Sequence, residues 1–287
     1  MKKTLLLLSL FLTFVVSAQE QYYSDVDLTA EGITLKENLA IKTINAHTNF
    51  LDYTWEASRI TDLDPNDSNN VLLIYGWENG SDGDVTNDLS RSKNNNGGNQ
   101  GDWNREHTFA NSLANPKLDN SGRNGTSFSD AHNLRASDVQ RNGLRGNRLF
   151  ADGSGNSGAV GSNWYPGDAT AGGTDWRGDA ARVTMYMYLR YGSQCLPRYN
   201  ASGNTNSIDA DMIDLLLDWN AADPVSPYED ARNTYHETTS TYAQGNRNPF
   251  IDNPYLATRI WGGTPAEDRW GIYTSNDNEA PTVPTNV

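Results

Sequence analysis

The pattern of apolar and polar residues predicts a mainly helical chain with few strands. Residues 35–48 carry apolar side chains at helical spacing, and Thr34 and Glu37 form a capping-box pattern at the start of this segment. Residues 71–75 are a short β-prone run and predict a strand. We expect the buried face of the first helix to carry Leu35, Leu39, Ile41 and Ile44.

Three more helices are expected in the C-terminal half. Residues 179–191 have the density and spacing of a buried helix, and residues 209–220 predict another with acidic residues near its positive end. Ser226 and Glu229 form a second capping box around Pro227, so a helix should run from there to about residue 239.

The two ends of the chain differ in composition from the rest. Residues 1–18 show two lysines, an apolar run and small residues before the expected cleavage point, which is the order of a secretory signal peptide. Residues 275–287 have the composition of a linker and resemble the start of a truncated C-terminal module. We expect one catalytic domain over residues 19–274, secreted or periplasmic, monomeric and not embedded in a membrane.

Charge and cysteine content narrow the choice of class. The formal net charge of -14 argues against binding nucleic acid or anionic lipid over the whole surface. Residues 105–148 nevertheless carry more basic than acidic side chains, so a local basic groove is possible there. Cys195 is the only cysteine, and the exported protein must fold without internal disulfides.

The residues that carry chemistry are concentrated between positions 103 and 147. Glu106 and His107 are neighbours, and amide and guanidinium side chains follow over residues 130–134 and 142–147. Histidine can take a proton from water near neutral pH, while carboxylate and amide oxygens suit Mg²⁺. Adjacent strand residues face opposite ways, so one of the pair should bind metal and the other should face water. This pattern is what metal-assisted hydrolysis of a phosphodiester requires.

Five ordered blocks make the similarity more specific. The chain resembles the bacterial endonuclease I family of extracellular and periplasmic nucleases, which have a ββα-metal, or His-Me finger, active site. The resemblance covers nearly all of residues 20–273, and its blocks are residues 103–113, 130–150, 176–191, 218–233 and 245–261. It implies an α+β fold, a mainly helical scaffold around a small ββα unit at about residues 101–150.

The resemblance also implies roles for individual residues. His107 matches the general base, and Glu106 and Asn142 match the metal ligands, with Mg²⁺ as the implied cofactor and Mn²⁺ or Ca²⁺ as alternatives. Arg145 and Arg123 are the candidates for the arginine that stabilises the transition state. Candidate contacts with substrate phosphate are Arg105, Asn147 and Asn133. The implied activity is cleavage of DNA, and possibly RNA, with little sequence preference, leaving 5′-phosphate ends.

The chain departs from the family pattern in two places. Thr108 and the residues after it stand where a proline is common, and Ala136 also replaces a usual proline; we expect these changes to affect local rigidity more than chemistry. Simpler interpretations also remain open. Asn142 precedes a glycine and could serve only in a turn, and His132 is interpreted as a structural histidine.

Two alternatives to a DNA-cutting enzyme follow from the sequence. One is a nuclease with the same site that prefers RNA. The other is a secreted protein without catalysis, whose Asp- and Asn-rich loops at residues 64–69 and 82–84 bind calcium and whose aromatic residues bind carbohydrate. These loops lack the full spacing of an EF-hand, so they support this alternative weakly.

Overall fold

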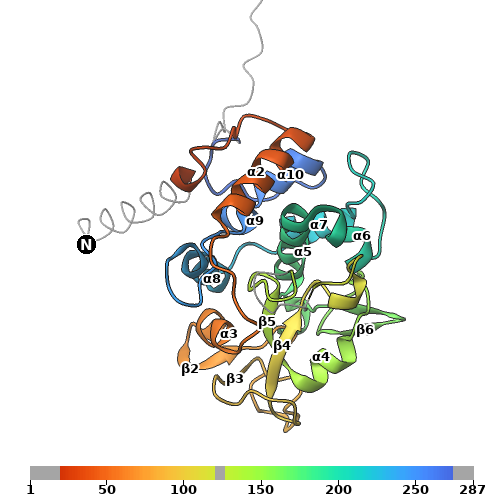
Figure 1. The fold of residues 1–287 in the computed structure, drawn as a ribbon. Helices are drawn as coiled ribbons and strands as arrows, with labels where there is room; N and C mark the ends of the chain where they lie inside the picture. The colour runs from red at the N-terminus through yellow and green to blue at the C-terminus, as the bar shows by residue number, and fades with distance from the viewer. Residues whose placement is uncertain (1–19, 120–126, 274–287) are drawn as a thin grey trace, which may run out of the picture.

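A computed structural model describes residues 20–119 and 127–273. Small antiparallel sheets flank a helical body, which confirms the expected α+β class. In Figure 1 the helices α2 (Gly32–Ala46), α9 (Pro249–Asp252) and α10 (Tyr255–Trp261) lie at the end opposite the small sheets. Helix α5 (Arg177–Tyr191) runs through the middle and contacts both α2 and α7 (Asp214–Ala222).

The main hydrophobic core surrounds α5. Most of its side chains are buried, and Met185 and Leu189 join side chains from α2, α7 and α10 in one cluster. The helix therefore has almost no exposed face, and its buried charged residues Asp179 and Arg182 are held in ion pairs. Other short helical segments are α3 (Glu56–Thr61), α4 (Val139–Arg145), α6 (Pro197–Asn200), α8 (Pro227–Glu237) and the 3₁₀ turns η1 (Asn111–Leu113), η2 (Ala169–Ala171) and η3 (Gly192–Cys195).

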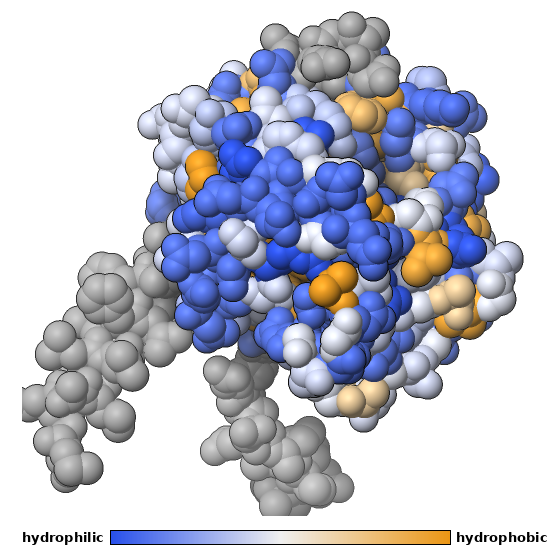
Figure 2. Space-filling view, turned by 90° about the horizontal axis from the view of Figure 1, so that it is seen from below, coloured by the Kyte–Doolittle hydropathy of each residue, from blue (hydrophilic) through white to orange (hydrophobic). Residues whose placement is uncertain are grey.

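Three separate sheets lie at the other end of the molecule. Strands β1 (Leu63–Asp64), β2 (Asp67–Leu72) and β3 (Ser90–Ser92) form the first sheet. Strands β4 (Trp103–His107) and β5 (Leu134–Asp138) pair as the second, and β6 (Gly158–Val160) and β7 (Asn163–Tyr165) as the third. Figure 2 views this end and shows a mostly hydrophilic surface with scattered apolar side chains.

The first helix differs from its prediction at its start and on one face. Helix α2 begins at Gly32, and its N-cap residue Glu31 makes no capping bond through its side chain, so the expected capping box is wrong. Leu35 and Leu39 are buried as expected. Ile41 and Ile44 are instead 58% and 44% exposed, because the buried stripe continues at i+4 spacing through Thr43 to His47.

The other predicted elements are confirmed with shifted limits. The capping box of Ser226 and Glu229 opens α8, whereas α7 begins at Asp214, five residues later than expected. Before α7, the side chain of Asn206 accepts hydrogen bonds from the backbone of Ile208 and Asp209, which holds that segment in a turn. The strand predicted over residues 71–75 is correct only for residues 71 and 72, because β2 ends at Leu72.

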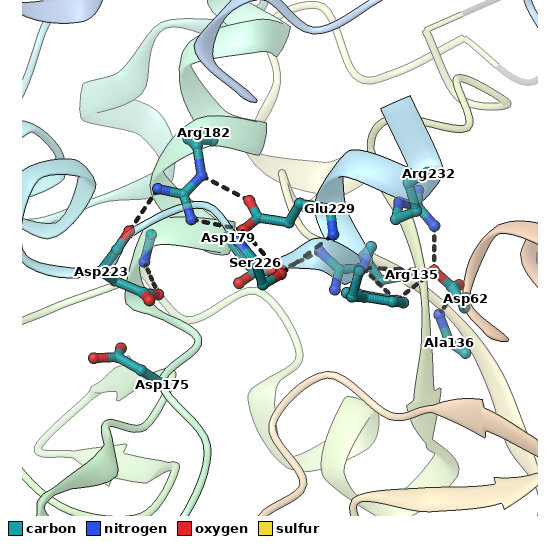
Figure 3. Close-up of polar contacts among 12 residues, drawn as sticks. Asp62, Arg135, Ala136, Asp175, Asp179, Arg182, Asp223, Ser226, Glu229 and Arg232 are labelled. Atoms are coloured by element: carbon teal, nitrogen blue, oxygen red, sulfur yellow. Dashed lines mark hydrogen bonds and ion pairs between the residues drawn. The ribbon is translucent and has the colours of Figure 1, made fainter. Parts of the chain in front are cut away.

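A buried network of ion pairs connects the helical body to β5 (Figure 3). Arg135 on β5 pairs with Asp179 of α5 at 2.8 Å, and Asp62 accepts a bond of 2.7 Å from the backbone nitrogen of Ala136. Arg232 of α8 pairs with Asp62 and donates to the carbonyls of Ala131 and Leu134. Buried pairs add little net stability, but each of these contacts fixes the position of β5.

In the part of the chain that the structure describes, no helix combines the length and the apolar character needed to span a bilayer.

Candidate active site

Strands β4 and β5 and helix α4 (Val139–Arg145) form a compact ββα unit. The strands pair antiparallel, with His107 opposite Leu134 and Trp103 opposite Asp138. Asp138 ends β5 and caps α4, since its side chain accepts hydrogen bonds from the backbone of Gln140 and Arg141. Strand and helix are therefore joined without a loop, which fixes the direction in which α4 leaves the sheet.

The alternation of β4 separates two groups of side chains. Asn104 and Glu106 share the face that meets α4, where Asn104 accepts a hydrogen bond of 2.7 Å from Asn142. Arg105 and His107 share the other face and lie beside Tyr53. The strand thus presents a carboxylate with amides on one side and an imidazole with a guanidinium on the other.

Glu106 is almost completely buried and is held through one of its oxygens. Its Oε1 accepts a hydrogen bond of 3.0 Å from the Tyr75 hydroxyl and pairs with Arg145 Nη1 at 3.0 Å. Burial raises the pKa of Glu106 to about 7, although Arg145 and Tyr75 oppose the rise. Oε2 accepts no hydrogen bond from any residue within 20–119 or 127–273, so it is the oxygen left for another ligand.

His107 is oriented by a backbone carbonyl and by two aromatic rings. Its Nε2 lies 2.7 Å from the carbonyl oxygen of Phe128. Because a carbonyl only accepts, Nε2 carries the proton and Nδ1 keeps its lone pair. Tyr53 stacks on the imidazole at 5.5 Å between ring centroids, and the Phe128 ring lies at 4.5 Å. Burial lowers the pKa of His107 to about 4, so the ring is neutral at pH 7.

A pocket of about 400 Å³ joins the two faces. Its lining includes Glu106, His107 and Asn142 together with Arg105 and Asn147. It has four further lining residues: Ala110, Asn111, Ser112 and Gly146. An imidazole, a carboxylate and amide oxygens are therefore all within reach of one bound group, which is the arrangement that hydrolysis of a phosphodiester needs.

Two comparisons with known proteins agree with this geometry. The sequence profile of Endonuclease I matches residues 31–255. The extracellular ribonuclease of Bacillus subtilis (strain 168) is 40% identical over 253 residues, which is 83% of this chain and 80% of that protein. The extracellular ribonuclease of Bacillus amyloliquefaciens is 38% identical over 248 residues, covering 84% of this chain and 78% of its own.

This chain belongs to the endonuclease I family. It is therefore a nuclease, and the alternative of a binding protein without catalysis is wrong. The loops that suggested calcium have a local role, because Asp64, Asp82 and Asp84 each accept a hydrogen bond from the backbone nitrogen two residues further on. These are turns that the side chains close themselves.

In this endonuclease I family member, Arg145 does not line the pocket, although the expected role of stabilising the transition state requires it to do so. Its side chain is fully buried and donates to the carbonyls of His107 and Thr108 and to the Asn200 side chain, besides pairing with Glu106. A phosphate in the pocket cannot reach a guanidinium without exposed surface. Arg145 therefore holds Glu106 and β4 in place, and the structure does not support its expected contact with the transition state.

Of the other candidates for contact with phosphate, some line the pocket and others are buried. Arg105 and Asn147 line the pocket, but Asn133 is fully buried and bonds to both backbone polar groups of Phe109, so it cannot contact phosphate. Arg123 lies outside the described residues. Of the basic side chains expected to form a groove, Arg135 is also buried in an ion pair, which leaves the pocket less basic than the sequence suggests.

The remaining histidines lie together away from the pocket. His132 is buried, and its Nε2 lies 3.1 Å from the carbonyl oxygen of Asn246. Its ring packs on His236 at 4.8 Å between centroids. His47 at the end of α2 is also buried. These contacts agree with the structural interpretation of His132.

Sequence reasoning missed three residues that hold the site. Tyr75 has a φ of 75°, an unusual value for a bulky residue, and this turn directs its hydroxyl to Glu106. Tyr53 and Phe128 contact His107 from segments distant in the sequence. None carries a motif, because a single aromatic residue in a loop gives no periodic signal.

Proposed function

We propose that the chain is a secreted, Mg²⁺-dependent endonuclease that hydrolyses DNA and RNA with little sequence preference. The observation that carries the proposal is the shared pocket of His107, Glu106 and Asn142. Export is supported by the leader-like residues 1–18 and by relatives named extracellular ribonuclease.

His107 would act as the base for the attacking water. With Nε2–H donated to Phe128, Nδ1 is free to accept a proton from water as the water attacks phosphorus. The rings of Tyr53 and Phe128 restrict rotation of the imidazole and keep that nitrogen in one direction. Attack opposite the 3′ oxygen would release that oxygen and leave the 5′ phosphate ends we propose.

The oxygen ligands on the α4 side fit a hard cation. Glu106 Oε2 and the side-chain oxygen of Asn142, Oδ1, accept no hydrogen bond within the described ranges 20–119 and 127–273. Across the same ranges, no group of three or more His, Cys, Asp or Glu side chains could hold a metal ion, so a cage made only of protein ligands is not supported. Mg²⁺ commonly keeps several waters and needs few carboxylates, and this sparse set suits it. When bound, it would supply positive charge to the phosphate and to the leaving oxygen.

A preference for RNA is a second candidate, favoured by the names of both relatives. We propose cleavage of both polymers, because the base and the oxygen ligands act on the phosphodiester that DNA and RNA share. The substrate class is the finer point that the experiment must decide.

The test uses the purified protein with supercoiled plasmid and with a structured RNA, each with Mg²⁺ and with EDTA. We expect both polymers to be cut only with Mg²⁺, and the products to be ligatable at their 5′ phosphates. His107→Ala should abolish cutting while circular dichroism and Mg²⁺ affinity stay unchanged. An intact plasmid beside degraded RNA would select the RNA-preferring alternative, and cutting in EDTA would refute the metal dependence. More than a few per cent of activity in His107→Ala would refute the base.

A further inference from the structure

The side chain of Arg105 is enclosed by two aromatic rings at the edge of the pocket. Its guanidinium carbon lies 3.6 Å from the centroid of Tyr53 and 3.8 Å from that of Trp55. Its Nη1 donates a hydrogen bond of 2.8 Å to the Tyr53 carbonyl. We call Tyr53, Arg105 and Trp55 the arginine clamp. It fixes the plane of a long side chain that is otherwise free to rotate.

Arg105 also lacks a counter-ion. Within residues 20–119 and 127–273 no carboxylate lies within ion-pair distance of it, and its Nε is buried without a hydrogen-bond partner. Arg145, by contrast, has a carboxylate partner, since its Nη1 lies 3.0 Å from Glu106 Oε1. A half-buried, oriented cation without a carboxylate in ion-pair contact is the state expected of a group that binds an anion.

The clamp lies beside the base and on the same face of β4. Arg105 and His107 are two residues apart, so their side chains leave the strand in the same direction, about 6.6 Å apart along it. This separation is comparable to that of neighbouring phosphates in one nucleic acid strand. A strand whose cleaved phosphate faces His107 therefore brings the next phosphate to Arg105.

The aromatic rings of the clamp already contact other side chains of the site. Tyr53 contacts the guanidinium and also stacks on His107 at 5.5 Å. Trp55 contacts the guanidinium and meets Trp103 edge to face at 5.5 Å. Aromatic residues near a nuclease site often hold bases, but here their surfaces already support the cation and the base.

We propose that the arginine clamp is a subsite for the phosphate next to the cleaved one, with Tyr53 and Trp55 as positioning residues for Arg105. The proposal rests on the nuclease function and deepens it, since it explains how the enzyme holds a polymer independently of sequence. Phosphate contacts carry no base information, which agrees with cleavage at many sites.

The test compares variants by steady-state kinetics on a polynucleotide at several salt concentrations. Arg105→Met should raise KM by about 10- to 100-fold, the loss of one charge-assisted contact, and change kcat less. It should also reduce the slope of log kcat/KM against log salt by about one charge. Arg105→Lys should restore that slope but only part of KM, because an ammonium lacks the planar stacking surface.

A matched control is Arg141→Met. Arg141 also lies over an aromatic ring, Trp77, at 4.1 Å, but does not line the pocket. We expect it to keep the salt slope of the natural enzyme. Trp55→Leu should raise KM without removing the charge dependence, and thermal unfolding of each variant separates these effects from loss of fold.

Each outcome has a separate meaning. If the natural protein cuts neither polymer, the proposed function fails. If it cuts but Arg105→Met keeps its KM and salt slope, the clamp is only structural and this inference is overturned. If Arg105→Met loses as much activity on a minimal diester such as bis(p-nitrophenyl) phosphate as on the polymer, Arg105 contacts the cleaved phosphate and the assignment to its neighbour is wrong.

Discussion

The pairing of Arg145 with Glu106 offers the sharpest test of the site's architecture. Arg145 is fully buried and bonds at 2.9 Å to each of the carbonyls of His107 and Thr108 and at 3.1 Å to Asn200. Arg145→Met removes the cation while keeping a long apolar side chain. The variant leaves Glu106, whose pKa is already raised to about 7, without the cation that opposes this rise, and it removes the donor from the carbonyls of His107 and Thr108.

The structure sets the expected magnitude. Removing one partner of a buried ion pair costs about 3–5 kcal/mol of the free energy of unfolding. Glu106→Gln breaks the same pair, so the double variant should lose about 2 kcal/mol less free energy of unfolding than the sum of the two single variants. The free energy of unfolding of Arg145→Lys should lie between those of the natural protein and Arg145→Met, because a lysine replaces the charge but cannot reach all of the acceptors of Arg145.

Urea denaturation followed by tryptophan fluorescence measures these free energies at neutral pH. Nuclease activity of the folded fraction is measured in parallel. If Arg145→Met unfolds within about 0.5 kcal/mol of the natural protein while activity falls a thousandfold or more, Arg145 acts on the transition state. That outcome would refute the assignment of Arg145 as a positioning residue.

Three further predictions concern the metal and the pH dependence of stability. Glu106→Gln should weaken Mg²⁺ affinity by about tenfold or more, measured by calorimetric titration, and an unchanged affinity would remove Glu106 from the ligands. Burial lowers the pKa of His132 from 6.5 to about 4, so only the unfolded chain gains a proton as the pH falls below 6.5. Between pH 7 and pH 5, the free energy of unfolding of His132→Gln should therefore fall by about 2 kcal/mol less than that of the natural protein. If the two proteins lose the same free energy of unfolding over this range, the ring of His132 is not buried in its neutral form. Burial and nearby Asp179 raise the pKa of Asp223 to about 8, so stability falls as the pH rises from 3.8 toward 8. Asp223→Asn, which can still accept the hydrogen bond from Gly178, should be more stable than the natural protein by about 1–2 kcal/mol at pH 8, and a less stable variant would show that the ionised carboxylate is needed.

The sequence predicts those parts of the fold that depend on neighbouring residues. The capping box of α8 is local, and so is the density of apolar residues in α5; both elements form where expected. The start of α7 was placed too early because Asn206, outside the apolar pattern, binds the backbone that follows it. Ile41 was expected to be buried but is exposed, because the elements that pack against a helix decide which of its faces is buried, and these elements are distant in the sequence.

The site shows a similar division. His107, Glu106 and Asn142 follow from a motif, and the structure brings all three to one pocket. Their catalytic roles stay predictions. Arg145 and Asn133 fall in the same motif but turn inward, because a polar residue in a short segment can serve either the pocket or the packing behind it. A count of basic residues could not distinguish these cases, since the buried carboxylates that pair with them lie far away in the sequence.

The attachment of β5 has a consequence for the order in which this nuclease becomes active. Arg232 donates to the carbonyls of Ala131 and Leu134, and Gln244 accepts from the backbone nitrogen of Ala131. These anchors are synthesised about a hundred residues after the strand that they secure. A chain still emerging from a ribosome has its whole cleavage motif before the side chains that immobilise it. The folded cleavage site is therefore expected only after Arg232 and Gln244 have been synthesised, because these side chains fix the strand that follows the motif.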